Sequence, residues 1–533
     1  MTDKIQKISI SEFLFYIYFG IMLITKGLGG VDGTTPFKCA LVASSLCVLV
    51  KIMLEKYSLL EYAAIVLMLG LGTLIWQISG NQSIIVIMFL IVSLKNIDIQ
   101  KAFKFAACVW GSSFVILILL HLFNLTSQDF VIHTKFGLGY VIRWALGYSH
   151  PNSLQIAYTV LVAYILQSMH CSIKKTAITL ILSTIGATYI FMFSLSATGA
   201  IMYIMMLLFY CIFYIKAYIN KAFNVFETIL LNLIFPLCAG SAILAPILLK
   251  GKAFDIVNSI MQTRPSLTRY FLTNYGLNLF GLDHTDIAAI YTLDSSYAYL
   301  LVDGGTIAFI FFIILYISMI NHSIQEFNTN PSIESAGRLA IIFSFAIAAI
   351  SEPFFFNISY KNVTILYAGS FLWDRLGTRN TDARHVILKL SNNSICQIEK
   401  LKAAIIKAVI YIYKAFNYVL HELIKIDVRR IVISVIAALV AVIIYLSVWA
   451  MPKAVYALRS SCDTDDNSVS IYLTEEEADY LRDSDDVWFL NYTDEETPML
   501  EFDGSIAGID TVRGIVTVSI LSYAFMNIFI VTV

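Results

Sequence analysis

The sequence predicts an all-α polytopic membrane protein with about 12 core transmembrane helices and two further C-terminal spans. Its 533 residues are 58% hydrophobic and only 14% charged, whereas soluble domains carry roughly 25% charged residues. Apolar runs of 18 or more residues recur along the chain, and each is long enough to cross a hydrocarbon core of about 30 Å.

The apolar runs give the expected position of each span. The first begins after Lys4 and Lys7 and has no small-residue cleavage site, so we expect it to remain in the protein. The core spans are expected at residues 10–28, 35–54, 58–79, 81–95, 103–124, 151–169, 175–194, 199–216, 228–249, 297–320, 337–352 and 361–374. Two more are expected at 430–450 and 513–533.

Basic residues fall mostly in alternate loops, and this pattern predicts the orientation. The positive-inside rule places these loops, and both termini, in the cytoplasm. The loops at 121–150, 250–297 and 353–361 are then external. The basic residues that decide the orientation are Lys4, Lys7, Lys51, Lys56, Lys95, Lys101, Lys104, Lys174, Lys175, Lys216, Lys221, Arg375, Arg379 and Arg384.

The composition divides the chain into a core and a tail. Residues 1–375 form the expected transmembrane core, whose major external loop is 250–297. Residues 376–429 are basic and amphipathic, which is typical of a cytoplasmic helix lying on anionic lipids. The span at 430–450 leads to an acidic external module at 451–512, and alternating residues at 469–473 and 487–490 predict a few strands in it. The last span is 513–533.

Cations in the external loops indicate an anionic ligand. Arg143, Arg264, Arg269 and Lys361 all lie outside in a chain that has few charges. Arg264 precedes Pro265 and is expected just outside a helix start, where a guanidinium suits phosphate oxygens. Arg269 is expected on the second turn, about 140° around the helix, so the two arginines would not form one clamp. An interfacial arginine that touches lipid headgroups is the alternative.

Five other residues expected outside are candidates for proton transfer or sugar binding. His150 could act as a general base, and Asn152 could bind a sugar or a phosphate, or both could simply form a helix start. His284, between Asp283 and Asp286, could orient hydroxyls or form an exposed rim. The remaining two candidates are Asp294, which also reads as a helix N-cap, and Glu352, for which pairing with an arginine is equally plausible.

Several motifs are missing from the sequence. It contains no P-loop, no HExxH, no GxSxG and no cysteine spacing typical of a zinc site. ATP-driven transport and zinc hydrolysis are therefore disfavoured, and we expect no metal, no cofactor and no nucleic-acid partner.

Three stretches resemble Wzy-type polysaccharide polymerases of the O-antigen ligase and polymerase superfamily. RWALGYSHPN (143–152) resembles the Arg…Gly-Phe-x-His-Pro-Asn stretch of capsule polymerases. Residues 263–281 resemble their Gly-Arg…Leu-Phe-Gly stretch, with Arg264 in the motif position and Thr263 in place of the usual glycine. Asp294-Ser295-Ser296-Tyr297 resembles their Asp-Asn-Ser-Tyr stretch. The likeness covers residues 10–375, and 376–533 have no counterpart.

The resemblance implies a metal-independent glycosyltransferase with a GT-C-like fold in the bacterial plasma membrane. Its substrate would be an oligosaccharide repeat unit of a capsule or exopolysaccharide linked to undecaprenyl diphosphate, polymerised at the outer face. Diphosphate and substrate would be bound by Arg143, Asn152, Arg264, Arg269, His284 and Lys361, and the hydroxyl proton would pass to His150, Glu352 or Asp294. Membrane lipids, a flippase and a chain-length regulator are the implied partners.

Two other classes of activity remain open alongside the polymerase. A lipid-linked oligosaccharide flippase would suit fourteen spans, but it would carry its charges inside the bundle rather than in external loops. A polysaccharide ligase would share the fold, but it would have a His-Asn pair near Asp294, where this chain has Asp-Ser-Ser. A third class is a binding or regulatory role, in which the acidic module at 451–512 recruits a partner, and this role is compatible with catalysis by the core.

Overall fold

The computed structural model describes residues 9–123, 125–126, 130–134, 140–168, 173–283, 293–377, 468–472, 490–492 and 498–503. The chain divides into two compact units. The first comprises residues 1–116, 155–187 and 196–406, and the second comprises 117–154, 188–195 and 407–533. The expected spans at 430–450 and 513–533, and nearly all of the basic segment 376–429, lie outside the described residues.

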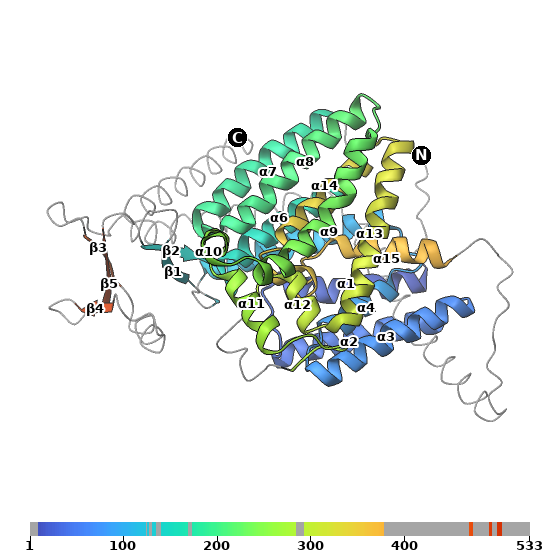
Figure 1. The fold of residues 1–533 in the computed structure, drawn as a ribbon, viewed down its shortest axis with the longest axis horizontal. Helices are drawn as coiled ribbons and strands as arrows, with labels where there is room; N and C mark the ends of the chain where they lie inside the picture. The colour runs from blue at the N-terminus through green and yellow to red at the C-terminus, as the bar shows by residue number, and fades with distance from the viewer. Residues whose placement is uncertain are drawn as a thin grey trace, which may run out of the picture. The chain divides into compact units, whose positions relative to one another are not determined.

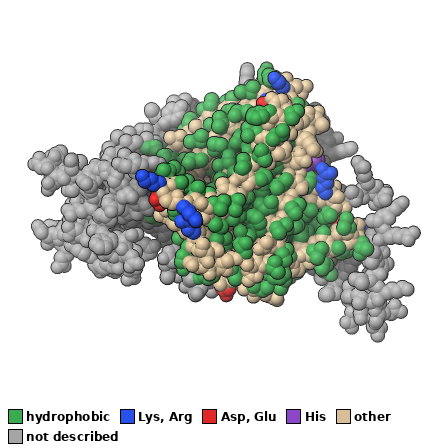
Figure 2. Space-filling view, in the orientation of Figure 1, with side chains coloured by type: hydrophobic (Ala, Val, Ile, Leu, Met, Phe, Trp, Pro, Cys, Tyr) green, Lys and Arg blue, Asp and Glu red, His purple; other side chains and the backbone are tan. Residues whose placement is uncertain are grey.

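The chain is mostly helical, and the described residues include eight helices long and apolar enough to cross a membrane. It is therefore a multi-pass membrane protein. Figure 2 shows apolar side chains over most of the described surface on the face it presents. The helices are α1 Ile10–Gly27, α2 Thr35–Leu54, α3 Leu59–Ser79, α4 Ser83–Ser93, α5 Ile99–Leu122, α6 Pro151–Ser168, α7 Ile173–Ser194, α8 Ala197–Tyr218, α9 Val225–Leu248, α10 Gly251–Ile260, α11 Arg264–Asn274, α12 Ser296–Val302, α13 Gly305–Thr329, α14 Ile333–Ala348 and α15 Thr364–Leu376, with a short 3-10 helix η1 at Pro353–Phe355.

Most helix ends lie within a few residues of the predicted ones, because local sequence signals define them. Ser58 caps α3 and Asn224 caps α9, each in a reciprocal pair with a glutamate three residues later. Gly80 ends α3 in the left-handed conformation. In the first unit α1 packs on α2, α3 on α4, and α14 on both α8 and α13 (Figure 1).

Two expected spans differ from the observed helices. The span predicted at 81–95 is a helix of only 11 residues, α4. The span predicted at 297–320 is broken at Asp303 into α12 and α13. Gly305 at the break has φ +80°, and a Cβ there would lie 2.3 Å from the backbone nitrogen of Gly281. Close approach of the 276–283 segment therefore requires glycine and ends the helix at this point.

The long loops that were expected outside contain more regular structure than the sequence indicated. The 250–297 loop holds α10 and α11. The 121–150 loop holds an antiparallel hairpin of β1 (Phe130–Thr134) and β2 (Tyr140–Trp144). In the acidic module, a three-stranded antiparallel sheet has the order β3 (Ser468–Tyr472), β5 (Pro498–Asp503), β4 (Leu490–Tyr492). The strand predicted near 469–473 corresponds to β3. The strand predicted near 487–490 overlaps β4 only at Leu490, since 487–489 lie outside the described residues, and β5 was not predicted.

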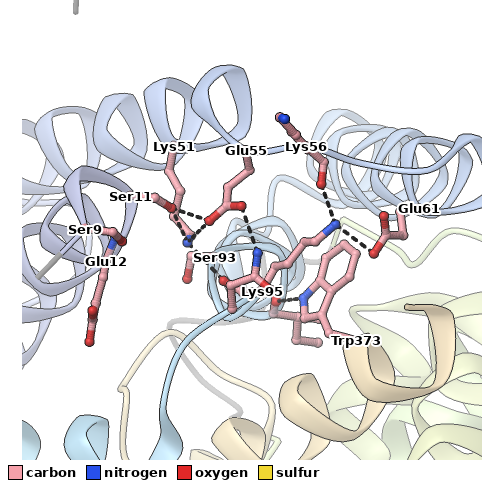
Figure 3. Close-up of polar contacts among 12 residues, drawn as sticks. Ser9, Ser11, Glu12, Lys51, Glu55, Lys56, Glu61, Ser93, Lys95 and Trp373 are labelled. Carbon is pink, nitrogen blue, oxygen red and sulfur yellow. Dashed lines mark hydrogen bonds and ion pairs between the residues drawn. The ribbon is translucent and has the colours of Figure 1, made fainter. Parts of the chain in front are cut away.

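At one end of the first unit, hydrogen bonds and ion pairs of two buried lysines, Lys51 and Lys95, connect several helices (Figure 3). Lys51, which is 1% exposed, donates to Ser11 Oγ at 2.8 Å and to the carbonyl of Lys95 at 3.0 Å. Lys95 pairs with Glu61 at 2.7 Å and lies 5.7 Å from the ring centre of Trp373. These contacts join α1, α2, α3, α4 and α15, so loops that were predicted to share one side of the membrane do meet. We call this the basic end.

Candidate functional site

Arg264 is the first residue of α11, not a residue before it. The turn from α10 places Gln262 and Thr263 in the left-handed region, at φ +53° and +64°. Pro265 then fixes the first helical turn, and the Asn258 side chain accepts a hydrogen bond from the Ser266 amide at 3.0 Å. The Arg264 side chain is left only 11% exposed.

Two carboxylates meet the guanidinium of Arg264. Its Nη2 lies 3.2 Å from Glu352 Oε1, and its Nε lies 3.4 Å from Asp294 Oδ2. Arg264 and Asp294 are 30 residues apart in the sequence, and Asp294 and Glu352 are 58 apart. Tertiary packing therefore brings the three together. The alternative that paired Glu352 with an arginine is confirmed. Asp294, by contrast, is not the N-cap of α12, because that position belongs to Ser295.

Glu352 is held in place by the start of α12. It lies beyond the end of α14, outside the membrane-spanning helices. The Ser296 hydroxyl donates to the Glu352 carbonyl and accepts from the Phe355 amide at 3.1 Å. The Ser296 amide donates to the carbonyl of Ala349 at 2.9 Å. The backbone on both sides of Glu352 is therefore fixed, and its side chain is directed to Arg264 by rigid elements.

Burial and charge act in opposite directions on Glu352. Burial raises the pKa of its carboxyl to about 7, and Asp294 adds to this, while Arg264, Lys361 and a hydrogen bond from Thr198 lower it. A carboxyl with such a pKa exists in both protonation states near neutral pH, which is the property required of a general base. Perturbation by burial beside a specific charge partner is typical of functional sites.

Lys361 adds a second cation beside Glu352. Burial lowers the pKa of its ammonium to about 8, and Glu352 opposes that shift. In the ranges that the structure describes, no hydrogen bond or ion pair satisfies this ammonium. A partly buried cation without a bonded partner is costly, so the position favours an anion from outside the protein.

The sequence did not single out two further charges near Lys361. Lys26 and Asp32 both influence the Lys361 ammonium, and they pair with each other. Lys26 is also 4.2 Å from the ring centre of Phe37. A lone lysine at the end of an apolar helix, 7% exposed here, is a signal that could have identified it.

Arg143, His150 and Asn152 form a separate group in the second unit. Arg143 is 4% exposed and donates through Nη2 to Asn152 Oδ1 at 2.6 Å. Its Nε donates to the Ser194 carbonyl at 2.9 Å. The backbone amide of Asn152 donates to His150 Nδ1 at 3.1 Å, at the first turn of α6. The structure thus brings these three predicted residues together, and it uses His150 as a helix-start acceptor.

Arg269 points away from the Arg264 cluster. It donates through Nε to the Pro246 carbonyl and through Nη2 to the Leu249 carbonyl, both at 2.5 Å. Its guanidinium stacks 3.5 Å over the Phe254 ring. These contacts satisfy the carbonyl end of α9, which gives Arg269 an anchoring role instead of the diphosphate contact that we expected. His284 lies outside the described residues.

Fold and cluster together define a class: a mostly helical, multi-pass membrane protein in which Arg264, at the start of α11, pairs with Glu352 and Asp294 from segments between helices. Among the described residues, no group of three His, Cys, Asp or Glu side chains is placed to hold a metal ion. Comparison with known protein families, curated proteins and solved structures finds no match for this chain.

Proposed function

We propose that this protein is a glycosyltransferase that polymerises oligosaccharide repeat units linked to undecaprenyl diphosphate. The work would take place at the outer face of a bacterial plasma membrane, in a core of about 12 spans with a GT-C-like fold. The observation that carries the proposal is the cluster of Arg264 with Glu352 and Asp294, beside Lys361. The resemblance to Wzy-type polymerases in three stretches supports the same activity.

The reaction requires a cation for the leaving group and an acceptor for one proton. The hydroxyl oxygen of the incoming repeat unit attacks the anomeric carbon of the growing chain, and the bond from that carbon to the diphosphate oxygen breaks. The carrier then departs as a diphosphate. Arg264 and Lys361 would stabilise the developing negative charge. Glu352 would accept the hydroxyl proton as a carboxylate.

Glu352 and Arg264 would exchange partners during this cycle. Without substrate, the two carboxylates occupy the guanidinium. A diphosphate, with more charge and more acceptor oxygens, would displace them. Glu352 would then lose its closest cation, and its affinity for a proton would rise when the acceptor hydroxyl must be deprotonated. The displacement would thus both bind the leaving group and make the Glu352 carboxylate a stronger base.

The test is Arg264→Ala, with Lys252→Ala as the matched control. Lys252 is an exposed cation on α10, in the same external segment. In cells that make the polymer, we expect Arg264→Ala to abolish it and leave single lipid-linked units at the surface, while Lys252→Ala makes polymer of normal length. Normal polymer in the Arg264 variant would contradict the proposal.

Two further outcomes of the same experiment separate the rival classes. Accumulation of lipid-linked units on the cytoplasmic leaflet would indicate a flippase. Full-length polymer that remains on its lipid carrier would indicate a ligase.

A further inference from the structure

An open groove with a volume of about 510 Å³ lies between α13 and α15. It belongs to the basic end, because Arg375 on its wall follows Trp373 by two residues and Trp373 lies 5.7 Å from Lys95. It is distant from the Arg264 cluster. A helix rises about 1.5 Å per residue, so His322 on the groove lies about 25 Å along α13 from Gly305.

The α13 wall of the groove changes from apolar to polar along one helical face. Phe311, Ile314 and Leu315 line one half, while Asn321 and His322 line the other. Their spacing of three, four and seven residues places them on a single stripe. The sequence predicts that the membrane span ends near residue 320, so the change in character coincides with the expected edge of the hydrocarbon.

Two basic side chains meet at the polar half. Arg375 Nη2 lies 3.3 Å from His322 Nδ1, and both residues pack on Phe371, with ring-centre distances of 5.3 and 5.4 Å. Arg375 makes no ion pair among the described residues. The nearby Glu326 is engaged by Arg338 at 2.5 Å, and Asp374, which does influence His322, does not line the groove.

We propose that this groove binds an anionic phospholipid. The headgroup phosphate lies on Arg375 and His322, and an acyl chain follows Phe311, Ile314 and Leu315. An apolar groove that opens to the hydrocarbon and ends at a guanidinium without an ion pair among the described residues matches such a lipid in both chemistry and polarity. The proposal is independent of the glycosyltransferase activity, because it uses no residue of that candidate site.

The test measures lipid retention by the full-length protein purified in detergent. The protein is incubated with equal amounts of dioleoyl-phosphatidylglycerol and dioleoyl-phosphatidylcholine, and bound lipids are counted by native mass spectrometry. We expect a preference for phosphatidylglycerol that falls about fivefold in Arg375→Gln, since one arginine near an anionic surface contributes about that factor. Lys101→Gln, at the same end but 43% exposed and outside the groove, should keep the preference.

A second variant tests the apolar half without changing charge. Ser318→Trp fills the groove between its two halves, and we expect it to lose the bound lipid while it remains folded by thermal unfolding. Equal retention of both lipids by the wild type, or an unchanged preference in Arg375→Gln, overturns the proposal. Displacement of phosphatidylglycerol by an equal concentration of inorganic phosphate also overturns it, because the groove would then bind a free anion.

Discussion

Replacing Arg264 with glutamine should destabilise the protein in a manner that depends on pH. The mutation removes the cation 3.2 Å from Glu352 Oε1. An opposite charge at this range lowers a carboxyl pKa by about one to three units, so its loss should move the pKa of Glu352 upward from about 7. In the unfolded chain that pKa is near 4.3. The folded state therefore binds the proton more tightly, and stability falls as pH rises to the folded pKa.

The expected size of the effect follows from this shift. In the wild type the loss of stability caused by ionisation of Glu352 ends near pH 7. In Arg264→Gln this loss continues above pH 7, because the pKa of Glu352 is higher. Each pH unit costs about 1.4 kcal/mol, so the difference between the two proteins should grow by about 2 kcal/mol between pH 7 and 8.5. At about 2–4 °C per kcal/mol for larger domains, the gap in Tm widens by about 4–8 °C.

Thermal unfolding in detergent, followed by tryptophan fluorescence at pH 6 and pH 8.5, measures this gap. The double variant Arg264→Gln/Glu352→Gln is the control, because it has no carboxyl at this position to titrate. Its Tm difference from the wild type should not widen as the pH rises. A gap for Arg264→Gln that is equal at the two pH values would refute the reasoning, as would a gap that widens equally in the double variant.

Three further variants test other parts of the structure. Thr263→Gly should raise stability by about 1 kcal/mol in thermal unfolding, because a threonine at φ +64° carries left-handed strain that glycine does not. His150→Ala should lower stability by about 1 kcal/mol, because the Asn152 backbone amide loses its acceptor, but polymerisation should continue at the wild-type rate. A polymerisation rate about a hundredfold lower would instead identify His150 as the general base. Lys95→Met should cost about 3–5 kcal/mol by leaving Glu61 buried without its cation, and adding Glu61→Gln should recover most of that loss.

The helical framework was predictable because it depends on local signals. Runs of apolar residues fixed where helices occur, and caps such as Ser58 and Asn224 fixed where they begin. The break at Asp303 was not predictable in the same way, since it depends on the approach of a segment more than 20 residues earlier in the chain. Asp303 itself, a carboxylate within an apolar run, was the signal that the run was not one plain span.

The candidate site also has features that the sequence predicts and features that only tertiary packing determines. Sequence reasoning selected Glu352 because a carboxylate at the edge of the hydrocarbon is expensive, Arg264 and Lys361 as cations in loops expected outside, and Asp294 as a candidate proton acceptor. Packing places the four in one cluster. From the residues alone both Arg264 and Arg269 were candidate anion ligands, and only the resemblance favoured Arg264 over Arg269. Only the structure directs Arg269 to the carbonyls of α9.

The departure at Thr263 connects the resemblance to the geometry. The Wzy-type stretch that residues 263–281 resemble has glycine where this chain has Thr263, and Thr263 has a left-handed backbone, at φ +64°, which glycine adopts without strain. The turn that presents Arg264 to Glu352 thus uses a backbone that glycine favours, although the residue here is threonine. A residue that keeps a costly conformation is held there by its surroundings. Here the surroundings are Pro265, the Asn258–Ser266 hydrogen bond and the two carboxylates, and the favourable contacts of the charge cluster at Arg264 offset the strain at Thr263.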